Sequence, residues 1–102
     1  MLAEFSIIPI GTGSSGLGDQ VAAVLRIVSE SGMPYKINPM GTVIEGEWES
    51  VMGLIRKCRD EIMKNQDRVL INITIDDRKG RLDRIEEKVA SVEKRLGRTL
   101  NK

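Results

Sequence analysis

Two stretches of the chain hold most of the side chains that can do chemistry. The first is Gly11-Thr12-Gly13-Ser14-Ser15-Gly16, which has the G-x-G-x-x-G spacing of dinucleotide-binding loops. The second, residues 36–49, supplies an amide, a thioether, a hydroxyl, a carboxylate and the only indole: Asn38, Met40, Thr42, Glu45 and Trp48. The chain contains no histidine, the commonest general base and metal ligand. We therefore expect these stretches to bind a molecule rather than to transform one.

The glycine-rich loop departs from a true dinucleotide fingerprint. The chain has no second mononucleotide-binding half, and no acidic residue ends the strand after the next helix. Two interpretations of the loop remain open. It is either a connector in which Ser15 caps the following helix, or a cradle in which N–H groups at the helix start hold a small anion or polar ligand.

Two other candidate sites are weaker. Asp76 and Asp77 are adjacent carboxylates at a predicted strand end, and neighbouring strand residues point to opposite sides. With Arg78 next in sequence, a turn with charge pairing is favoured over a metal site. Cys58 lies on the apolar face of a predicted helix, so we interpret it as a small buried hydrophobe. We expect no enzyme, no metal and no resident cofactor.

Composition indicates a single soluble domain spanning residues 1–102. The net charge is +1, so nothing draws the chain strongly to nucleic acid or membrane. Aromatic residues make up 3%, which predicts an aliphatic core. The lone cysteine, and an N-terminus without a basic region or long apolar run, lead us to expect a reducing cytoplasm and no signal peptide.

Hydropathy periods predict the element order β-α-β-β-α-β-α. Strands are expected at 2–10, 35–39, 42–46 and 68–76, and helices at 18–31, 47–65 and 81–97, with a frayed tail at 97–102. The first six elements match the split βαβ pattern. The predicted fold is therefore α+β: a ferredoxin-like βαββαβ antiparallel sheet with an added C-terminal helix.

This topology places the turn at 39–41 at the same end of the sheet as the loop at 11–18. Thr12, Ser14, Asn38 and Thr42 should converge there. Glu45 should lie about 10 Å further along its strand, nearer Trp48. The alternative is that Asn38 and Thr42 are ordinary turn and strand residues, and that Glu45 is a solvated charge.

The last predicted helix carries a narrow apolar stripe. Its residues are spaced 3, 4, 3, 4, as in a coiled-coil seam: Leu82, Ile85, Val89, Val92 and Leu96. The stripe either docks on the chain's own sheet or packs against another protomer. We favour the protomer because one sheet face has no other helix to cover it. That face offers Ser6, Asn72 and Thr74, where RNA-recognition sheets carry aromatic residues, so we expect no nucleic-acid binding.

Three segments, 9–14, 31–46 and 68–78, resemble the thiamine-binding, YkoF-like family of small proteins, long known only as an uncharacterised protein family. The segment Met40-Gly-Thr-Val-Ile-Glu-Gly46 is the most specific. The resemblance covers about residues 2–97. It implies a ferredoxin-like domain with a C-terminal helix, no known catalysis, and dimers that pair into a homotetramer through the sheet and that helix. In some members it implies binding of thiamine or its hydroxymethylpyrimidine part.

Carrying the family's motif positions over suggests Thr12, Asn38, Thr42 and Glu45 as pocket residues. We therefore predict a non-catalytic binding protein for thiamine or a related hydroxymethylpyrimidine-type heterocycle, held at a protomer boundary. The alternative is an oligomeric scaffold or regulatory subunit that holds another small ligand or anion. The predicted ligand-binding set is Thr12, Ser14, Asn38, Met40, Thr42, Glu45 and Trp48.

Overall fold

The structure is a computed structural model that describes residues 1–11, 13, 17–79 and 85–101. In chain order the elements are β1 (Leu2–Pro9), α1 (Gly18–Glu30), β2 (Tyr35–Asn38), β3 (Gly41–Glu45), α2 (Trp48–Met63), β4 (Val69–Asp76) and α3 (Ile85–Leu96). The predicted order is confirmed. Residues 81–84, with which we expected the last helix to begin, lie outside the described residues.

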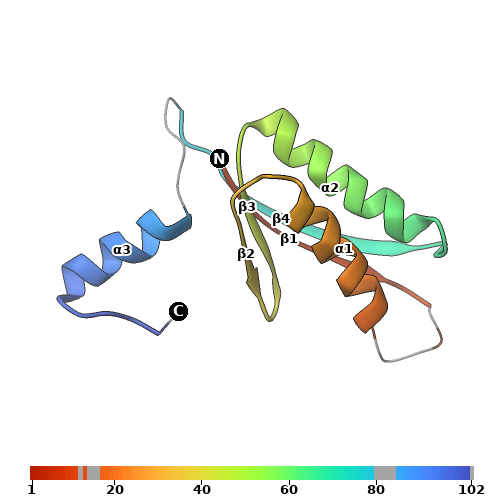
Figure 1. Cartoon of the computed structure of the whole chain (residues 1–102), viewed down its shortest axis with the longest axis horizontal. Helices are drawn as coiled ribbons and strands as arrows, with labels where there is room; N and C mark the ends of the chain where they lie inside the picture. Colours follow the sequence, from red (N-terminus) through yellow and green to blue (C-terminus); the bar gives the residue numbers. More distant parts are fainter. Residues whose placement is uncertain (12, 14–16, 80–84, 102) are drawn as a thin grey trace.

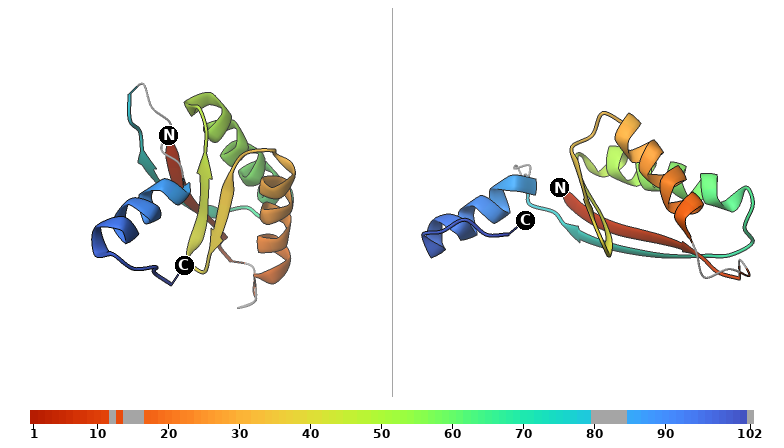
Figure 2. Two further views of the ribbon diagram at one scale, coloured as in Figure 1. Left: turned by 60° about the vertical axis from the view of Figure 1, so that its left-hand side comes forward. Right: turned by 60° about the horizontal axis from the view of Figure 1, so that its bottom comes forward.

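The four strands form one antiparallel sheet in the order β2-β3-β1-β4. The long pairing joins β1 to β4, from Leu2 opposite Asp76 to Pro9 opposite Val69. Helices α1 and α2 both lie on one face of this sheet (Figures 1 and 2). This is the predicted ferredoxin-like arrangement, in which two right-handed crossovers place both helices on the same side.

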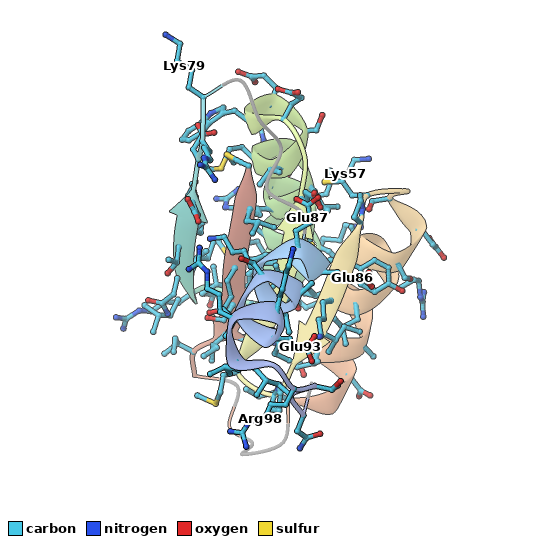
Figure 3. All side chains as sticks on the ribbon, turned by 90° about the vertical axis from the view of Figure 1, so that its left-hand side faces the viewer. Lys57, Lys79, Glu86, Glu87, Glu93 and Arg98 are labelled. Carbon is cyan, nitrogen blue, oxygen red and sulfur yellow. The ribbon has the colours of Figure 1, made fainter. Side chains whose placement is uncertain are left out.

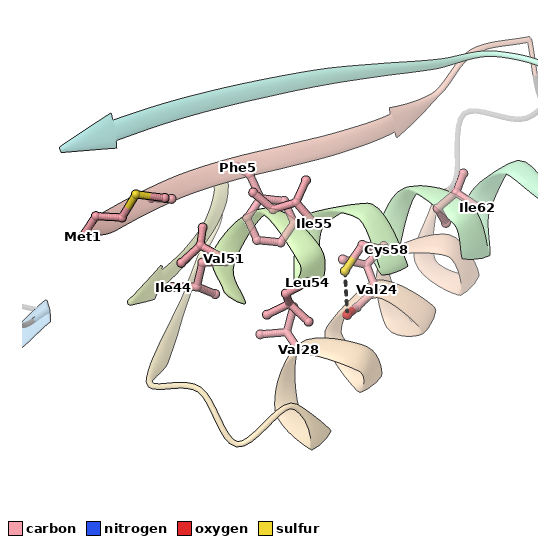
Figure 4. Close-up of a cluster of buried hydrophobic side chains, with 11 residues drawn as sticks. Met1, Phe5, Val24, Val28, Ile44, Val51, Leu54, Ile55, Cys58 and Ile62 are labelled. Atoms are coloured by element: carbon pink, nitrogen blue, oxygen red, sulfur yellow. Dashed lines mark hydrogen bonds between the residues drawn. The ribbon is translucent and has the colours of Figure 1, made fainter. Parts of the chain in front are cut away.

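The core lies between the two helices and the sheet. Strand alternation turns Ala3 and Phe5 of β1 and Ile44 of β3 toward the helices. Helical spacing brings one stripe of each helix down onto them. The buried cluster contains a single aromatic ring, as the composition predicts (Figure 4): Met1, Ala3, Phe5, Val24, Val28, Ile44, Val51, Leu54, Ile55, Cys58 and Ile62.

The other face of the sheet is largely uncovered. Across its two longest strands, Glu4 lies opposite Thr74, Ser6 opposite Asn72, and Ile8 opposite Leu70. The middle of this open face is therefore polar, and an apolar pair, with Ile8 38% and Leu70 52% exposed, lies toward one end.

Helix α3 leaves the sheet at the opposite end from that apolar pair and projects away from the body of the fold (Figures 1 and 2). None of its described residues is buried. Along its stripe Ile85 and Val89 are half-buried, while Val92 and Leu96 are 46% and 53% exposed; Leu82 lies outside the described residues. The radius of gyration is 15.2 Å, against about 13 Å for a compact chain of this length. The chain's own sheet thus leaves most of the stripe uncovered.

Gly97 ends α3. Its φ of +71° is a left-handed conformation that favours glycine at helix ends. The N–H groups of Gly97 and Arg98 both donate to the carbonyl oxygen of Glu93, and the Leu100 N–H donates to the Glu93 carboxylate. The described tail therefore turns back along the last turn of the helix.

Candidate ligand-binding site

A hollow of about 260 Å³ opens beside the turn between β2 and β3. The second half of β1 forms its floor, α1 forms one wall, and the hairpin turn forms the other. The lining is mainly aliphatic, with a few polar groups: Phe5, Ser6, Ile7, Ile8, Val21, Val24, Leu25, Ile37, Asn38, Pro39, Met40, Gly41 and Thr42. No charged residue is among them. An apolar hollow with a few polar groups is the usual form of a small-molecule site.

The hairpin holds one wall of the hollow close to β1. Asn38 pairs with Gly41 across the two-residue turn Pro39-Met40. A Cβ atom at Gly41 would lie 3.1 Å from the Phe5 carbonyl oxygen and 3.3 Å from Cγ of Glu4. A side chain at position 41 would crowd the β1 backbone, so the absence of one at Gly41 suits the close approach of β3 to β1 at the wall of the hollow.

Three of the predicted site residues line the hollow: Asn38, Met40 and Thr42. Thr42 is 6% exposed and lies opposite Phe5 and Ile37, so its side chain shares the helix-covered face. Asn38 pairs with Gly41 one position along, and alternation turns its side chain to the other face. Met40 is 87% exposed at the tip of the turn. We infer that Thr42 contributes from inside the hollow and Asn38 from its edge.

Glu45 and Trp48 are not brought to this hollow. Glu45 ends β3, three residues beyond Thr42 and so about 10 Å along the strand, as the sequence predicts. It is 8% exposed, and its Oε1 accepts a hydrogen bond of 3.4 Å from the Ile85 N–H. Trp48 begins α2 and is 50% exposed. A ligand role for these two residues stays a prediction.

Thr12 and Ser14 lie outside the described residues. The glycines beside Thr12 have left-handed conformations, with φ of +79° at Gly11 and +75° at Gly13. The register of β1 with β3, Phe5 opposite Thr42, carries the end of β1 past the hairpin turn. The loop therefore departs from the same end of the sheet as the turn, as the topology predicts.

A second groove lies at the far end of β3, between the sheet and α3. It is lined by Pro34, Tyr35, Lys36, Glu45, Ile85, Glu86 and Glu87. Figure 3 looks onto this end of the molecule, with Glu86 and Glu93 of α3 labelled beside β2. Unlike the hollow, this groove is rich in charge, and the sequence patterns did not predict it.

At the two other candidate sites, Cys58 and Asp76 make contacts within the fold. Cys58 is buried, and its thiol lies 3.9 Å from the Val24 carbonyl oxygen (Figure 4). Burial raises the pKa of the thiol to about 11, so it is a poor nucleophile at neutral pH. Asp76 forms an ion pair with Lys88, not with the nearby Arg78. The described residues contain no group of three or more side chains that would hold a metal ion.

Among the described helices, none combines the length and apolar character that crossing a bilayer requires.

The sequence is similar to curated relatives over nearly the whole length of both chains. A UPF0045 protein of Mycobacterium bovis is 37% identical over 97 residues, covering 94% of each chain. The UPF0045 protein YqgV of Bacillus subtilis is 36% identical over 100 residues, covering 93% of this chain and 96% of its own.

Solved structures share the fold. A hypothetical protein from Methanocaldococcus jannaschii superposes with a TM-score of 0.81 at 27% identity, covering 89% of this chain and 93% of that one. A candidate thiamine biosynthesis/salvage protein from Thermotoga maritima superposes with a TM-score of 0.76 at 25% identity, covering 89% and 96%. The model of the family described as "Thiamine-binding protein" matches residues 3–93. The chain therefore belongs to the thiamine-binding protein family.

Proposed function

We propose that this chain is a non-catalytic binding protein for thiamine or a related hydroxymethylpyrimidine-type heterocycle. The observation that carries the proposal is the hollow beside the hairpin turn, whose apolar lining includes Thr42 on its inner wall and Asn38 at its edge. Family membership supports the ligand class, and the candidate thiamine role of the Thermotoga maritima protein supports it further.

The size and charge of the hollow favour one part of the ligand. Sites for drug-sized molecules measure about 300–1,000 Å³, and this hollow has about 260 Å³. A single uncharged ring fits such a space better than a two-ring cation. The aminopyrimidine ring therefore enters the hollow, and the cationic ring of thiamine extends past Met40 toward the loop at residues 11–17. Thr12 and Ser14 are proposed to contact it there.

Hydrogen-bonding chemistry assigns roles to the polar residues. The Asn38 amide offers both an acceptor and donors, so it can pair with a ring nitrogen and an exocyclic amine together. Thr42 offers a hydroxyl from the inner wall. Met40 is flexible and polarizable, which suits it to cover an aromatic ring.

Titration calorimetry with thiamine, its phosphates and hydroxymethylpyrimidine tests the proposal. Asn38→Ala should weaken binding by about 1–3 kcal/mol, a factor of about 5–150 in Kd. Thr42→Val should weaken it through the lost hydroxyl at nearly constant size. Asn65→Ala is the matched control, because Asn65 is an exposed asparagine just after α2, outside the lining and outside the sheet.

Two results would overturn the proposal. If Asn38→Ala and Asn65→Ala bind thiamine as tightly as the wild type, the hollow is not the site. If the wild type binds none of these heterocycles, the ligand assignment fails, and the scaffold or regulatory subunit with another small ligand or anion takes its place. Mass spectrometry of the ligand after incubation would reveal any catalysis.

We further propose that the chain assembles as a homotetramer, a dimer of dimers that uses the sheet and α3, with the ligand at a protomer boundary. Exposed apolar side chains support this: Val92 and Leu96 on α3, and the pair Ile8 and Leu70 on the uncovered sheet face. Sedimentation should give about four times the chain mass of 11.4 kDa. A monomer would refute the assembly.

The free, buried Cys58 supports a reducing compartment such as the cytoplasm.

A further inference from the structure

Glu45 is a buried carboxylate outside the proposed ligand hollow. Glutamate is rarely this buried unless a partner satisfies it. Its described partner is the Ile85 N–H, 3.4 Å from Oε1 and 40 residues away in sequence. Ile85 begins α3, and N–H groups in the first turn of a helix have no carbonyl partner within the helix. Glu45 thus accepts, from the end of a strand, a hydrogen bond from the first residue of α3.

A second carboxylate holds α3 from the other side of β1. Asp76 ends β4 and forms an ion pair with Lys88, three residues beyond Ile85. Leu2 of β1 lies opposite Glu45 on one side and opposite Asp76 on the other. The three side chains therefore share a row on the open face. The two carboxylates lie two strand spacings apart in that row, about 10 Å.

Both carboxylates lie next to positive charge on α3. The first turn of a helix is the positive end of its dipole, so the Glu45 carboxylate is favourable there. Lys88 supplies an opposite charge to Asp76 one turn later. Beyond this turn α3 packs less closely against the rest of the chain, since Val92 and Leu96 are about half exposed. The direction of α3 depends on the contacts at its start.

We propose that Glu45 and Asp76 are positioning residues that clamp the first turn of α3 to the end of the sheet. The clamp sets the direction in which α3 presents its apolar stripe to a second copy of the chain. The clamp itself depends only on contacts within one chain. Its consequence for assembly rests on the proposed homotetramer. Glu45 then supports the helix instead of touching the ligand.

Amide exchange measured by NMR on the full chain tests the clamp. Glu45→Leu removes the acceptor at similar size, and the Ile85 amide should exchange about fivefold faster while the Phe5 amide in the core is unchanged. Glu86→Gln is the matched control, because it removes the same charge from the first turn of α3 without touching the sheet row. It should leave Ile85 exchange near the wild-type rate.

A charge swap tests the second contact. Asp76→Lys should speed exchange in the first turn of α3, and adding Lys88→Asp should restore it. If the Ile85 amide in Glu45→Leu exchanges at the wild-type rate, or if the swap restores nothing, the clamp is refuted. Should Glu45→Leu or Asp76→Lys fail to fold, Glu45→Gln and Asp76→Asn carry the same test with a smaller acceleration.

Ligand binding separates this inference from the proposed function. Weaker thiamine binding by Glu45→Leu with unchanged Ile85 exchange would assign Glu45 to the ligand and overturn the clamp. If the wild type binds no thiamine, the proposed function fails, but the exchange rates still decide whether the clamp exists.

Discussion

Replacing Gly41 with alanine tests how closely the hairpin must approach β1. The added Cβ would lie 3.1 Å from the Phe5 carbonyl oxygen, 3.3 Å from Cγ of Glu4 and 3.6 Å from its Cδ. The Glu4 side chain can move aside, but the Phe5 oxygen belongs to the backbone of a central strand. We therefore expect the backbone at the wall of the hollow to adjust by a few tenths of an ångström.

Two opposing effects set the change in unfolding free energy that Gly41→Ala causes. Crowding a packed site costs about 1–3 kcal/mol, and replacing glycine returns about 0.4–1 kcal/mol through the unfolded chain. We expect Gly41→Ala to lose about 1–2 kcal/mol of unfolding free energy. For a domain of this length, each 1 kcal/mol lowers Tm by about 4–8 °C.

Gly53→Ala is the matched control. Gly53 lies within α2, and a Cβ there meets nothing within 4 Å. The same substitution should stabilise the fold by about 0.5–1 kcal/mol, because glycine is a poor helix former. Urea unfolding followed by circular dichroism measures both variants against the wild type.

The critical outcome is that Gly41→Ala lowers the unfolding free energy while Gly53→Ala raises it. A Gly41→Ala variant as stable as the wild type, with an unchanged slope in urea, would show that the hairpin tolerates a side chain there. The close approach would then be no requirement of the hollow. If the approach does shape the hollow, Gly41→Ala should also bind thiamine more weakly, whereas Gly53→Ala should not.

Two further predictions concern Cys58 and α3. With its pKa raised from 9.0 to about 11, the Cys58 thiolate is about 100-fold scarcer than in the unfolded chain at neutral pH, so iodoacetamide should label the native protein far more slowly than the unfolded one. Because the pKa of Cys58 is higher in the folded state, the contribution of the thiol to stability is complete below pH 9 and is lost as pH rises toward 11. Between these pH values the unfolding free energy of Cys58→Ala should therefore fall less than that of the wild type. An equal fall in both proteins would contradict the raised pKa of Cys58. Val89→Asp should dissociate the proposed assembly in sedimentation, since it buries an unpaired carboxylate. Ser91→Asp, on the opposite side of the helix, should leave the mass of the assembly unchanged. If Val89→Asp sediments with the same mass as Ser91→Asp, the apolar stripe does not form the interface.

Local patterns in the sequence were sufficient to predict the elements and their faces. Ala3 and Phe5 alternate with Glu4 and Ser6, and such alternation has one solution in a sheet with one covered face. Pro39 lies in the hairpin turn, a position that its fixed φ favours. The absence of histidine and the buried position of Cys58 followed from composition and helical spacing alone.

Only the tertiary structure decided which polar residues meet. Thr42 and Asn38 are close in sequence, but the pairing of β3 with β1 and β2 turns them to opposite faces. Glu45 contacts Ile85, 40 residues later, through the relative placement of β3 and α3, and no local period encodes that contact. The physical reason is that alternation and helical spacing express short-range conformational preferences. Register between distant strands and the docking of a helix arise instead from many weak long-range contacts, which a single sequence does not display.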